Sequence, residues 1–463
     1  MTHQPGLRRA ITNRPSRKPE IAAAVGALVL VAAFFLPAMT APSPAVDASA
    51  ARVTRVCPST DAGAQVGVGS AGSGVAQAAL ASPATTVAAA SGDVITLTKE
   101  PIRLSAPQPT PFWGVVSASA DASPDQGLSL APCQQPRARQ WFTGVRSNTN
   151  ARADIVLVNL DSADAAVNVS VWGADGALGA AGGRGVVVAG QSQKVLSLGP
   201  LVDSPTPVTL QLTTSSGRVA AFVRQRLFNG AAPLGADWIA PSAEPSTTVV
   251  IPSVPAGAGA RTLILGNPGD RTAQVKVEVL GADGAFSLVG VEQVDVPAGA
   301  TRAFPLEGSL AGKVAALRLT STHEVLGAVE ASGAADWATL DGVAPLGGQA
   351  VATIPLPPGV TPVVTVANPS AAPAHVSLTI TDADGKELAK SSVDVPASAS
   401  LVVEPGVTPV AKLTVTSSEP SVRVGVAASG TVGTVAGLAV LPISDASSSL
   451  PTVTLTPEPR LGT

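Results

Sequence analysis

The sequence predicts an all-β protein of tandem immunoglobulin-like β-sandwich domains behind one N-terminal transmembrane helix. Three observations lead to this prediction: a segment that occurs three times, alternating apolar and polar residues within each copy, and an apolar run that follows basic residues. The copies are residues 155–160, 263–268 and 364–369, and each is typical of the opening hairpin of a sandwich.

The repeat keeps a fixed internal register. In each copy an Asn precedes the Asp of an Asp-Gly pair by 16 residues, while the spacing between copies varies. Asp-Gly suits a tight hairpin because both residues tolerate a positive φ. A fixed offset within a variable period indicates a rigid motif with adjustable loops. The predicted structural turns are Asn159, Asp175 and Gly176, then Asn267, Asp283 and Gly284, then Asn368, Asp384 and Gly385.

The strands of each copy alternate with period two. In the second copy, Val275, Val277 and Val279 are expected to face the core, and the polar residues between them to face water. Units of roughly 100 residues with about six or seven short strands match an immunoglobulin-like sandwich. The predicted sandwiches span residues 141–246, 247–348 and 349–446, and residues 447–463 form a C-terminal tail.

The N-terminus predicts the compartment. Residues 1–20 are basic and residues 21–39 form an uncharged apolar run long enough to span a bilayer as a helix. Basic residues before such a run keep the start of the chain in the cytoplasm and send the remainder across. The alternative is a cleaved secretory signal, for which residues 48–50 offer a small-x-small site. Either way, residues 40–52 are a linker and the body is extracytoplasmic, in a single-pass cell-membrane protein or in a secreted one.

Two cysteines, Cys57 and Cys133, precede the repeats. In an oxidising compartment an isolated pair is most simply one disulfide, closing a loop of about 76 residues. Residues 53–140 are therefore expected to form a disulfide-containing N-terminal subdomain whose fold the sequence leaves open.

Charge and composition limit the partners. The chain has 463 residues with 13% charged residues and 45% hydrophobic ones, which is too apolar for a disordered protein. Residues 41–463 hold 24 basic and 31 acidic side chains, so nucleic acid is not an expected partner. The local basic concentration is either a solvated surface or a patch for an envelope polymer with phosphate or carboxylate groups, and comprises Arg137, Arg139, Arg146, Arg152, Arg224 and Arg226.

Catalytic patterns are scarce. The three histidines, His3, His323 and His375, lie beside no triad motif, and no zinc-type spacing is present. We therefore predict no enzyme, no catalytic or metal-binding residues and no cofactor.

A recurring Asp-Trp pair is more suggestive. Asp237-Trp238 and Asp336-Trp337 occur late in the first two copies, whereas the third copy has no Trp. One interpretation is structural, with each indole covering the end of a core and each aspartate bonding a loop amide. The other makes these residues, together with Trp172 on an outer strand face, contacts for a sugar ring or a partner protein.

With these residues in hand, the chain resembles an actinobacterial family of extracytoplasmic proteins of unknown function. The resemblance rests on the anchor, Cys57-Pro58, residues 133–144, the repeated Asn-Pro and Asp-Gly phrases and Asp237-Trp238. It implies a membrane-anchored protein encoded beside envelope glycosyltransferases, and hence a role in cell-envelope biogenesis.

Two functional hypotheses follow. The first is a non-enzymatic, membrane-tethered scaffold or interaction protein of the bacterial cell envelope, anchored by its N-terminal helix and contacting an envelope protein or glycan. The second is a carbohydrate-binding module protein that acts beside envelope glycan synthesis.

Overall fold

The computed structural model describes residues 52–58, 64–71, 74–79, 87–97, 100–107, 112–122, 124–306, 310, 312–382, 385–405 and 412–444. These residues form an all-β fold of several small antiparallel sheets, as the alternation predicted. The basic segment 1–20, the apolar run 21–39 and the tail 447–463 lie outside them. Among the residues described, no helix has the length and apolar character that a membrane span requires.

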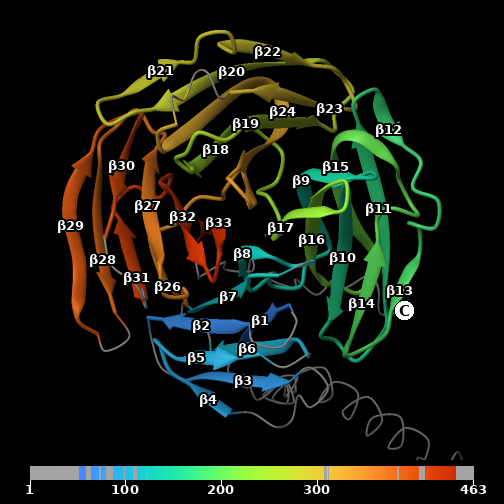
Figure 1. Ribbon diagram of the computed structural model, residues 1–463, viewed down its shortest axis with the longest axis horizontal. Coiled ribbons are helices and arrows are strands. Elements are labelled where there is room, and N and C mark those ends of the chain that lie inside the picture. The colour runs from blue at the N-terminus through green and yellow to red at the C-terminus, as the bar shows by residue number, and fades with distance from the viewer. Residues whose placement is uncertain are drawn as a thin grey trace, which may run out of the picture. The chain divides into compact units, whose positions relative to one another are not determined.

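The sheets are grouped in four units, each with two sheets around a core, as Figure 1 shows. The N-terminal unit spans residues 52–132, with sheets ordered β1-β6-β3-β4 and β5-β2-β7-β8. Its strands are β1 (Arg52–Cys57), β2 (Gln65–Ser70), β3 (Val75–Ala79), β4 (Val87–Ala89), β5 (Val94–Thr96), β6 (Ile102–Pro107), β7 (Phe112–Ala120) and β8 (Gly127–Pro132). The predicted disulfide is formed, and it joins Cys57 at the end of β1 to Cys133 just after β8.

The first repeat spans residues 139–239. One sheet has the order β12-β11-β15-β9, with β13 also paired to β11, and the other has the order β14-β10-β16-β17. The strands are β9 (Arg139–Ser147), β10 (Ala151–Asn159), β11 (Ala165–Gly173), β12 (Gly176–Leu178), β13 (Val186–Val188), β14 (Ser192–Ser197), β15 (Ser204–Ser216), β16 (Ala220–Asn229) and β17 (Ala232–Ile239).

The second repeat spans residues 246–341, and one long strand belongs to both of its sheets. The N-terminal part of β24 pairs with β18 and β20, and its C-terminal part pairs with β19 and β25. The strands are β18 (Ser246–Val254), β19 (Arg261–Asn267), β20 (Ala273–Leu280), β21 (Ala285–Ser287), β22 (Gln293–Val296), β23 (Ala300–Pro305), β24 (Ala315–Ser332) and β25 (Trp337–Asp341).

The third repeat spans residues 349–443, with sheets β26-β31-β28-β29 and β30-β27-β32-β33. Its strands are β26 (Gln349–Thr353), β27 (Val360–Asn368), β28 (Ala374–Thr381), β29 (Glu387–Val395), β30 (Ala399–Val403), β31 (Lys412–Ser417), β32 (Arg423–Val432) and β33 (Val435–Ile443). In strand order, both this repeat and the N-terminal unit read first-sixth-third-fourth and fifth-second-seventh-eighth. The N-terminal unit is thus a fourth copy of the same topology.

The inward alternation predicted for the second repeat is present. Val275, Val277 and Val279 on β20 are buried, whereas Gln274 and Lys276 are exposed. Glu278, expected to face water, is covered because Lys276 and Arg318 pair with its carboxylate at 2.7 and 2.9 Å.

The units share their cores in a closed cycle. Trp238 of the first repeat packs in the core of the N-terminal unit, and Trp337 of the second repeat packs in the core of the first. Leu438 of the third repeat enters the core of the second, and Trp113 of the N-terminal unit enters the core of the third. The last strands follow the same cycle: β17 contacts β8 and β25, and β33 contacts β25 and β8. We call these four strands the junction.

Candidate functional site

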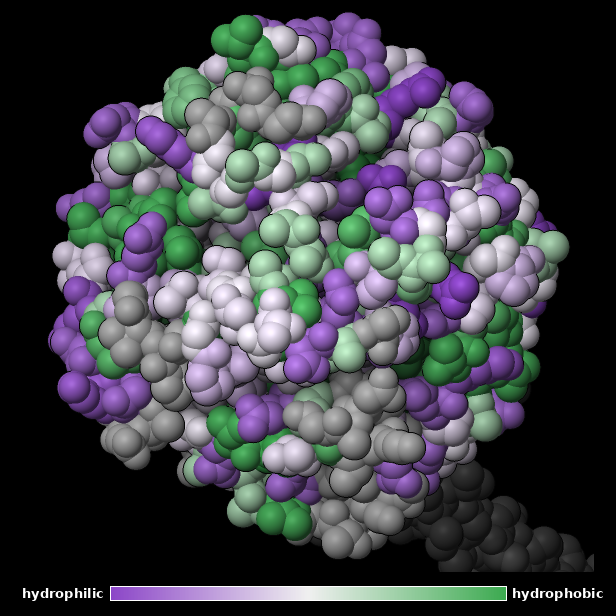
Figure 2. Space-filling model, in the orientation of Figure 1, coloured by the Kyte–Doolittle hydropathy of each residue, from purple (hydrophilic) through white to green (hydrophobic). Residues whose placement is uncertain are grey.

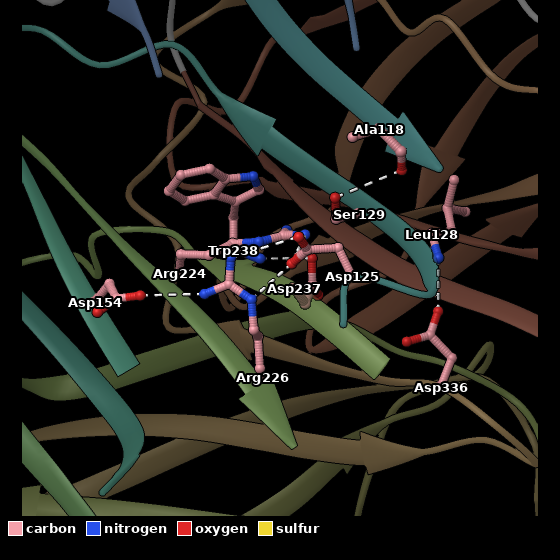
Figure 3. A network of polar contacts seen from close by, with 10 residues as sticks. All are labelled: Ala118, Asp125, Leu128, Ser129, Asp154, Arg224, Arg226, Asp237, Trp238 and Asp336. Atoms are coloured by element: carbon pink, nitrogen blue, oxygen red, sulfur yellow. Dashed lines mark hydrogen bonds and ion pairs between the residues drawn. The ribbon is translucent and has the colours of Figure 1, made fainter. Parts of the chain in front are cut away.

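Asp336 ties three units together at the junction. Its Oδ2 atom accepts hydrogen bonds from the backbone N–H of Leu128 in the N-terminal unit and of Leu438 in the third repeat, both at 2.8 Å. Its Oδ1 atom accepts the N–H of Trp337 at 2.9 Å. Figure 3 shows the carboxylate facing the Leu128 amide. One buried side chain therefore satisfies three backbone donors that would otherwise lack partners in the protein interior.

The junction carries aspartate in two units and glycine in the other two. Asp237-Trp238 and Asp336-Trp337 correspond in place to Gly127-Leu128 and Gly437-Leu438, which start the equivalent part of β8 and β33. A Cβ atom on Gly127 would lie 2.4 Å from Asp336 Oδ2, and one on Gly437 would lie 2.9 Å from Leu128 Cβ. These short distances leave no room for a third aspartate.

Burial changes the acidity of three carboxyl groups. It raises the pKa of Asp336 to about 7, against the backbone hydrogen bonds that favour the charged form. Burial, together with the nearby charge of Asp336, raises the pKa of Asp237 well above its ordinary value. Burial also raises the pKa of Asp341, whose Oδ2 atom accepts the N–H of Thr143 in the first repeat at 3.0 Å. All three groups favour the proton-bound form more strongly than exposed aspartates do.

An ion-pair network joins the N-terminal unit to the first repeat (Figure 3). Asp125, in the loop before β8, pairs with Arg226 at 2.7 Å and with Arg224 at 3.3 Å. Arg226 also pairs with Asp154 at 3.1 Å, and the Arg224 guanidinium lies 5.2 Å from the ring centre of Trp238. Burial lowers the pKa of Arg224. Two of the six arginines singled out in the sequence therefore bind acidic side chains within the protein.

The other four arginines of the predicted patch have different surroundings. Arg146 makes a two-pronged pair with Glu330 of the second repeat, at 2.8 and 2.9 Å. Arg152 lies over the ring of Phe228 at 5.2 Å. Arg137 and Arg139 line a pocket described below, and Arg139 pairs there with Glu244 at 3.2 Å. In Figure 2, hydrophilic and apolar residues are interspersed over the visible face.

The Asp-Trp tryptophans lie inside the protein. Trp238 and Trp337 are 4% and 1% exposed, and each aspartate accepts the N–H of its own tryptophan, at 2.7 and 2.9 Å. Trp172 is half-buried, its ring 5.4 Å from that of Trp141, and its backbone carbonyl accepts the Thr301 hydroxyl of the second repeat. Of the three tryptophans singled out, Trp172 alone keeps a substantial exposed surface.

The repeated Asn residues have one role in all three copies. Asn159, Asn267 and Asn368 are fully buried at the ends of β10, β19 and β27. Each side-chain amide donates to the carbonyl four residues on and to a carbonyl 27 to 29 residues on, and each amide oxygen accepts the N–H two residues on. Each Asn thus fastens the turn after its own strand to the end of a later strand of the same unit, which is β13, β22 or β29.

The glycines of the Asp-Gly pairs all adopt positive φ. The angles are 127° at Gly176, 142° at Gly284 and 81° at Gly385. Asp175 and Asp283 precede the first two of these glycines, and neither has a positive φ. Asp384, the third aspartate of the predicted turns, lies outside the described residues.

A Ser-His-Asp arrangement, which sequence spacing did not reveal, lies on β28 and β29. His375 Nδ1 is 2.8 Å from Asp394 Oδ1, and its Nε2 is 3.2 Å from Ser392 Oγ. This is the connectivity of a catalytic triad. The His375 and Asp394 side chains are 58% and 73% exposed, so the arrangement is open to water.

A pocket of about 200 Å³ is lined by residues of all four units. The N-terminal unit supplies Arg55 and Trp113 and the third repeat supplies Pro442. The adjoining walls come from β9, with the segment before it, and from residues 240–244 and 341–345. The sequence did not mark Arg55, Trp113 or Asp341 as site residues. Arg55 and Trp113 lie in strands of the N-terminal unit, whose fold the sequence left open. Asp341 is followed by Gly342, and an Asp-Gly pair is typical of a turn. Among the described residues, no group of three or more His, Cys, Asp or Glu side chains is placed to hold a metal ion.

The fold and the junction define an all-β protein whose small antiparallel sheets are locked together by buried carboxylates. The chain belongs to a family of unknown function, DUF5719, whose family profile matches residues 87–406. The matched span includes part of the N-terminal unit, the first two repeats and most of the third. A comparison with curated proteins found no match.

Proposed function

We propose that the protein is a non-enzymatic, membrane-tethered scaffold of the bacterial cell envelope. In this proposal, immunoglobulin-like sandwiches follow a single transmembrane helix at residues 21–39, and the family is an actinobacterial one associated with the envelope. The body is extracytoplasmic and presents surfaces to an envelope protein or glycan partner, with neither nucleic acid nor a cofactor involved.

The observation that carries the proposal is that acidic side chains connect neighbouring units. Asp336 bonds the backbones of three units, and Asp125 and Glu330 pair with arginines across two unit boundaries. Buried polar contacts of this kind fix the mutual geometry of elements, because breaking one leaves an unpaired group in the interior. A body with fixed geometry holds its outward surfaces at constant separations, as a scaffold requires.

The disulfide supports the proposed compartment. Cys57 and Cys133 are both fully buried and bonded to each other, and structural disulfides persist mainly in oxidising compartments. Anchoring by residues 21–39 and cleavage after residue 50 both deliver the described body to such a compartment.

The test is an affinity purification of the full-length tagged protein from its own envelope, with an ectodomain of residues 41–463 as the matched control. Bound proteins and glycans are identified by mass spectrometry. Recovery of the same envelope proteins by both forms supports a scaffold whose partners contact the body. Recovery by neither form contradicts it.

A second measurement addresses catalysis directly. The purified protein is incubated with ester substrates and envelope glycans, and the Ser392→Ala variant is the control. We expect no turnover above that of Ser392→Ala, because the exposed His375 lacks the water-excluded environment in which such groups catalyse efficiently. Turnover that Ser392→Ala abolishes would overturn the non-enzymatic proposal.

The second candidate function is carbohydrate binding beside envelope glycan synthesis. The pocket at the junction of the four units favours it, since tryptophan, arginine and carboxyl side chains meet there in a small cavity. Recovery of glycan without protein in the affinity purification supports this candidate.

A further inference from the structure

We infer that the pocket where the four units meet binds a single anionic sugar residue. The inference deepens the second candidate function and is independent of the scaffold proposal. It rests on the pocket's size, on two buried polar groups without partners and on the charge of its wall.

The size of the pocket selects one sugar ring. Its volume of about 200 Å³ equals that of about six or seven waters, at about 30 Å³ each. A monosaccharide has this size, whereas a folded peptide segment or a lipid chain does not. A residue at the end of a longer glycan could also enter, with the rest of the chain outside.

Two buried polar groups that line the pocket have no hydrogen-bond partner among the described residues. They are Nε1 of Trp113 and Oδ1 of Asp341, on side chains from residues only 4% and 5% exposed. Each unpaired group costs free energy, which a hydrogen bond to a ligand would recover. One is a donor and the other is a carboxyl oxygen, so a ligand that carries both an acceptor and a hydroxyl satisfies both.

The wall of the pocket is basic on balance. Arg55, Arg137 and Arg139 line it, and Arg139 is paired with Glu244. Arg55 lies over the ring of Trp113 at 4.7 Å and donates to the Cys133 carbonyl, which holds its charge at the pocket. The exposed Arg137 guanidinium makes no ion pair with the described residues. Guanidinium groups bind carboxylate and phosphate in a bidentate manner, so the charge favours an acidic sugar over a neutral one.

Other residues give the pocket a fixed shape. The Trp141 indole N–H donates to Glu244 Oε2 at 3.1 Å, and the remaining Asp341 oxygen is held by the Thr143 N–H. The walls also contain prolines, which add rigid apolar surface; among them are Pro132, Pro241 and Pro345. A preformed pocket loses little conformational entropy when a ligand enters.

The test is isothermal titration calorimetry of the full-length protein in detergent. The probes are glucuronic acid, glucose 6-phosphate, glucose and inorganic phosphate, and the variants are Arg137→Gln and, as matched control, the exposed Arg184→Gln outside this pocket. We expect saturable binding of an anionic sugar, at least tenfold weaker binding of glucose, and at least a tenfold loss in Arg137→Gln with none in Arg184→Gln. Stronger binding of glucuronic acid identifies a carboxylate ligand, and stronger binding of glucose 6-phosphate identifies a phosphate ligand.

Three outcomes overturn the inference. If no sugar binds saturably, the pocket is filled by water, and if inorganic phosphate binds as tightly as the anionic sugars, it holds an adventitious ion only. Sugar binding that is unchanged in Arg137→Gln is the third. Asp341→Asn gives a second check, because it keeps an acceptor for Thr143 and should still weaken sugar binding while the protein stays folded. Glycan recovery in the affinity purification, combined with an unaffected Arg137→Gln, leaves carbohydrate binding standing and rejects this pocket.

Discussion

The wild type should lose stability as pH rises, and replacing Asp336 with Asn should abolish this pH dependence. The pKa of Asp336 is about 7 in the folded protein, against 3.8 for an ordinary aspartate. An acid whose pKa is raised by folding binds its proton more tightly in the folded state. Its contribution is therefore fully present below pH 3.8 and is lost as pH rises through 7.

The magnitude follows from the size of the shift. A shift of about 3 pH units corresponds to about 4 kcal/mol, of which about 2 to 3 kcal/mol is lost between pH 5 and pH 8. Asn stays neutral over this range, and its amide oxygen can replace only part of a carboxylate that accepts three N–H groups. Losing one of these bonds costs about 1 to 3 kcal/mol at any pH. Asp336→Asn should thus be less stable than wild type at pH 5, and the gap should close by pH 8.

The assay is urea unfolding followed by tryptophan fluorescence at pH 5, 6, 7 and 8. The free energy of unfolding of the wild type minus that of Asp336→Asn is the quantity to plot. Asp203→Asn is the matched control, because it makes the same change of side chain at an exposed position. A difference between wild type and Asp336→Asn that stays constant from pH 5 to pH 8 would refute the reasoning.

Three further experiments test other contacts of the fold. Trp337→Ala should lower the free energy of unfolding by about 3 to 5 kcal/mol, because the indole is fully buried in a neighbouring unit's core. Trp172 is half-buried, so Trp172→Ala should lower it clearly less. Equal losses for the two variants in urea unfolding would contradict this packing. Replacing both Cys57 and Cys133 with Ser should lower the free energy of unfolding by about 4 kcal/mol, seen as a lower urea midpoint than that of the oxidised protein. A urea midpoint that does not change when the wild type is reduced would show that the disulfide adds no stability. Asn267→Ala should lower the free energy of unfolding by about 3 kcal/mol, because its side-chain hydrogen bonds to the backbone are lost. Amide hydrogen exchange should then speed up first in the turns that Asn267 joins. Faster exchange elsewhere but not in these turns would exclude this role.

The strand pattern of the repeats could be predicted because its causes are local. Period-two alternation identified Val275, Val277 and Val279 as core residues, and a strand's side chains alternate whatever it packs against. The Asn of each copy could likewise be assigned to a turn, although its bond to a carbonyl 27 to 29 residues on could not.

The sequence did not reveal that the N-terminal unit is a fourth copy of the topology. Ser70 ends β2 in the N-terminal unit, where Asn residues end β10, β19 and β27. Its amide takes the Ser91 hydroxyl as its acceptor, so a different side chain fastens this position. Strand order is set by backbone pairing, which many sequences satisfy, and repeat detection depends on the side chains.

The candidate site could not be predicted because it joins residues distant in the sequence. Asp336 meets Leu128 across 208 residues, and Asp341 meets Thr143 across 198. Sequence periodicity reports which side of a strand a residue faces, and it carries no information about which unit lies on that side. For this reason the sequence did not reveal that Arg146, Arg224 and Arg226 pair with acidic residues of other units or strands.

The exchange of core side chains between units also bears on how the chain is made. Trp113 emerges early in synthesis, but the core that receives it is in the third repeat, which is made later. Until then the N-terminal unit lacks the residues that cover this indole, and a chain that stops before the third repeat leaves it uncovered. Exposed apolar surface of this kind attracts chaperones and proteases. The cycle of contacts thereby makes the burial of this N-terminal indole depend on the third repeat.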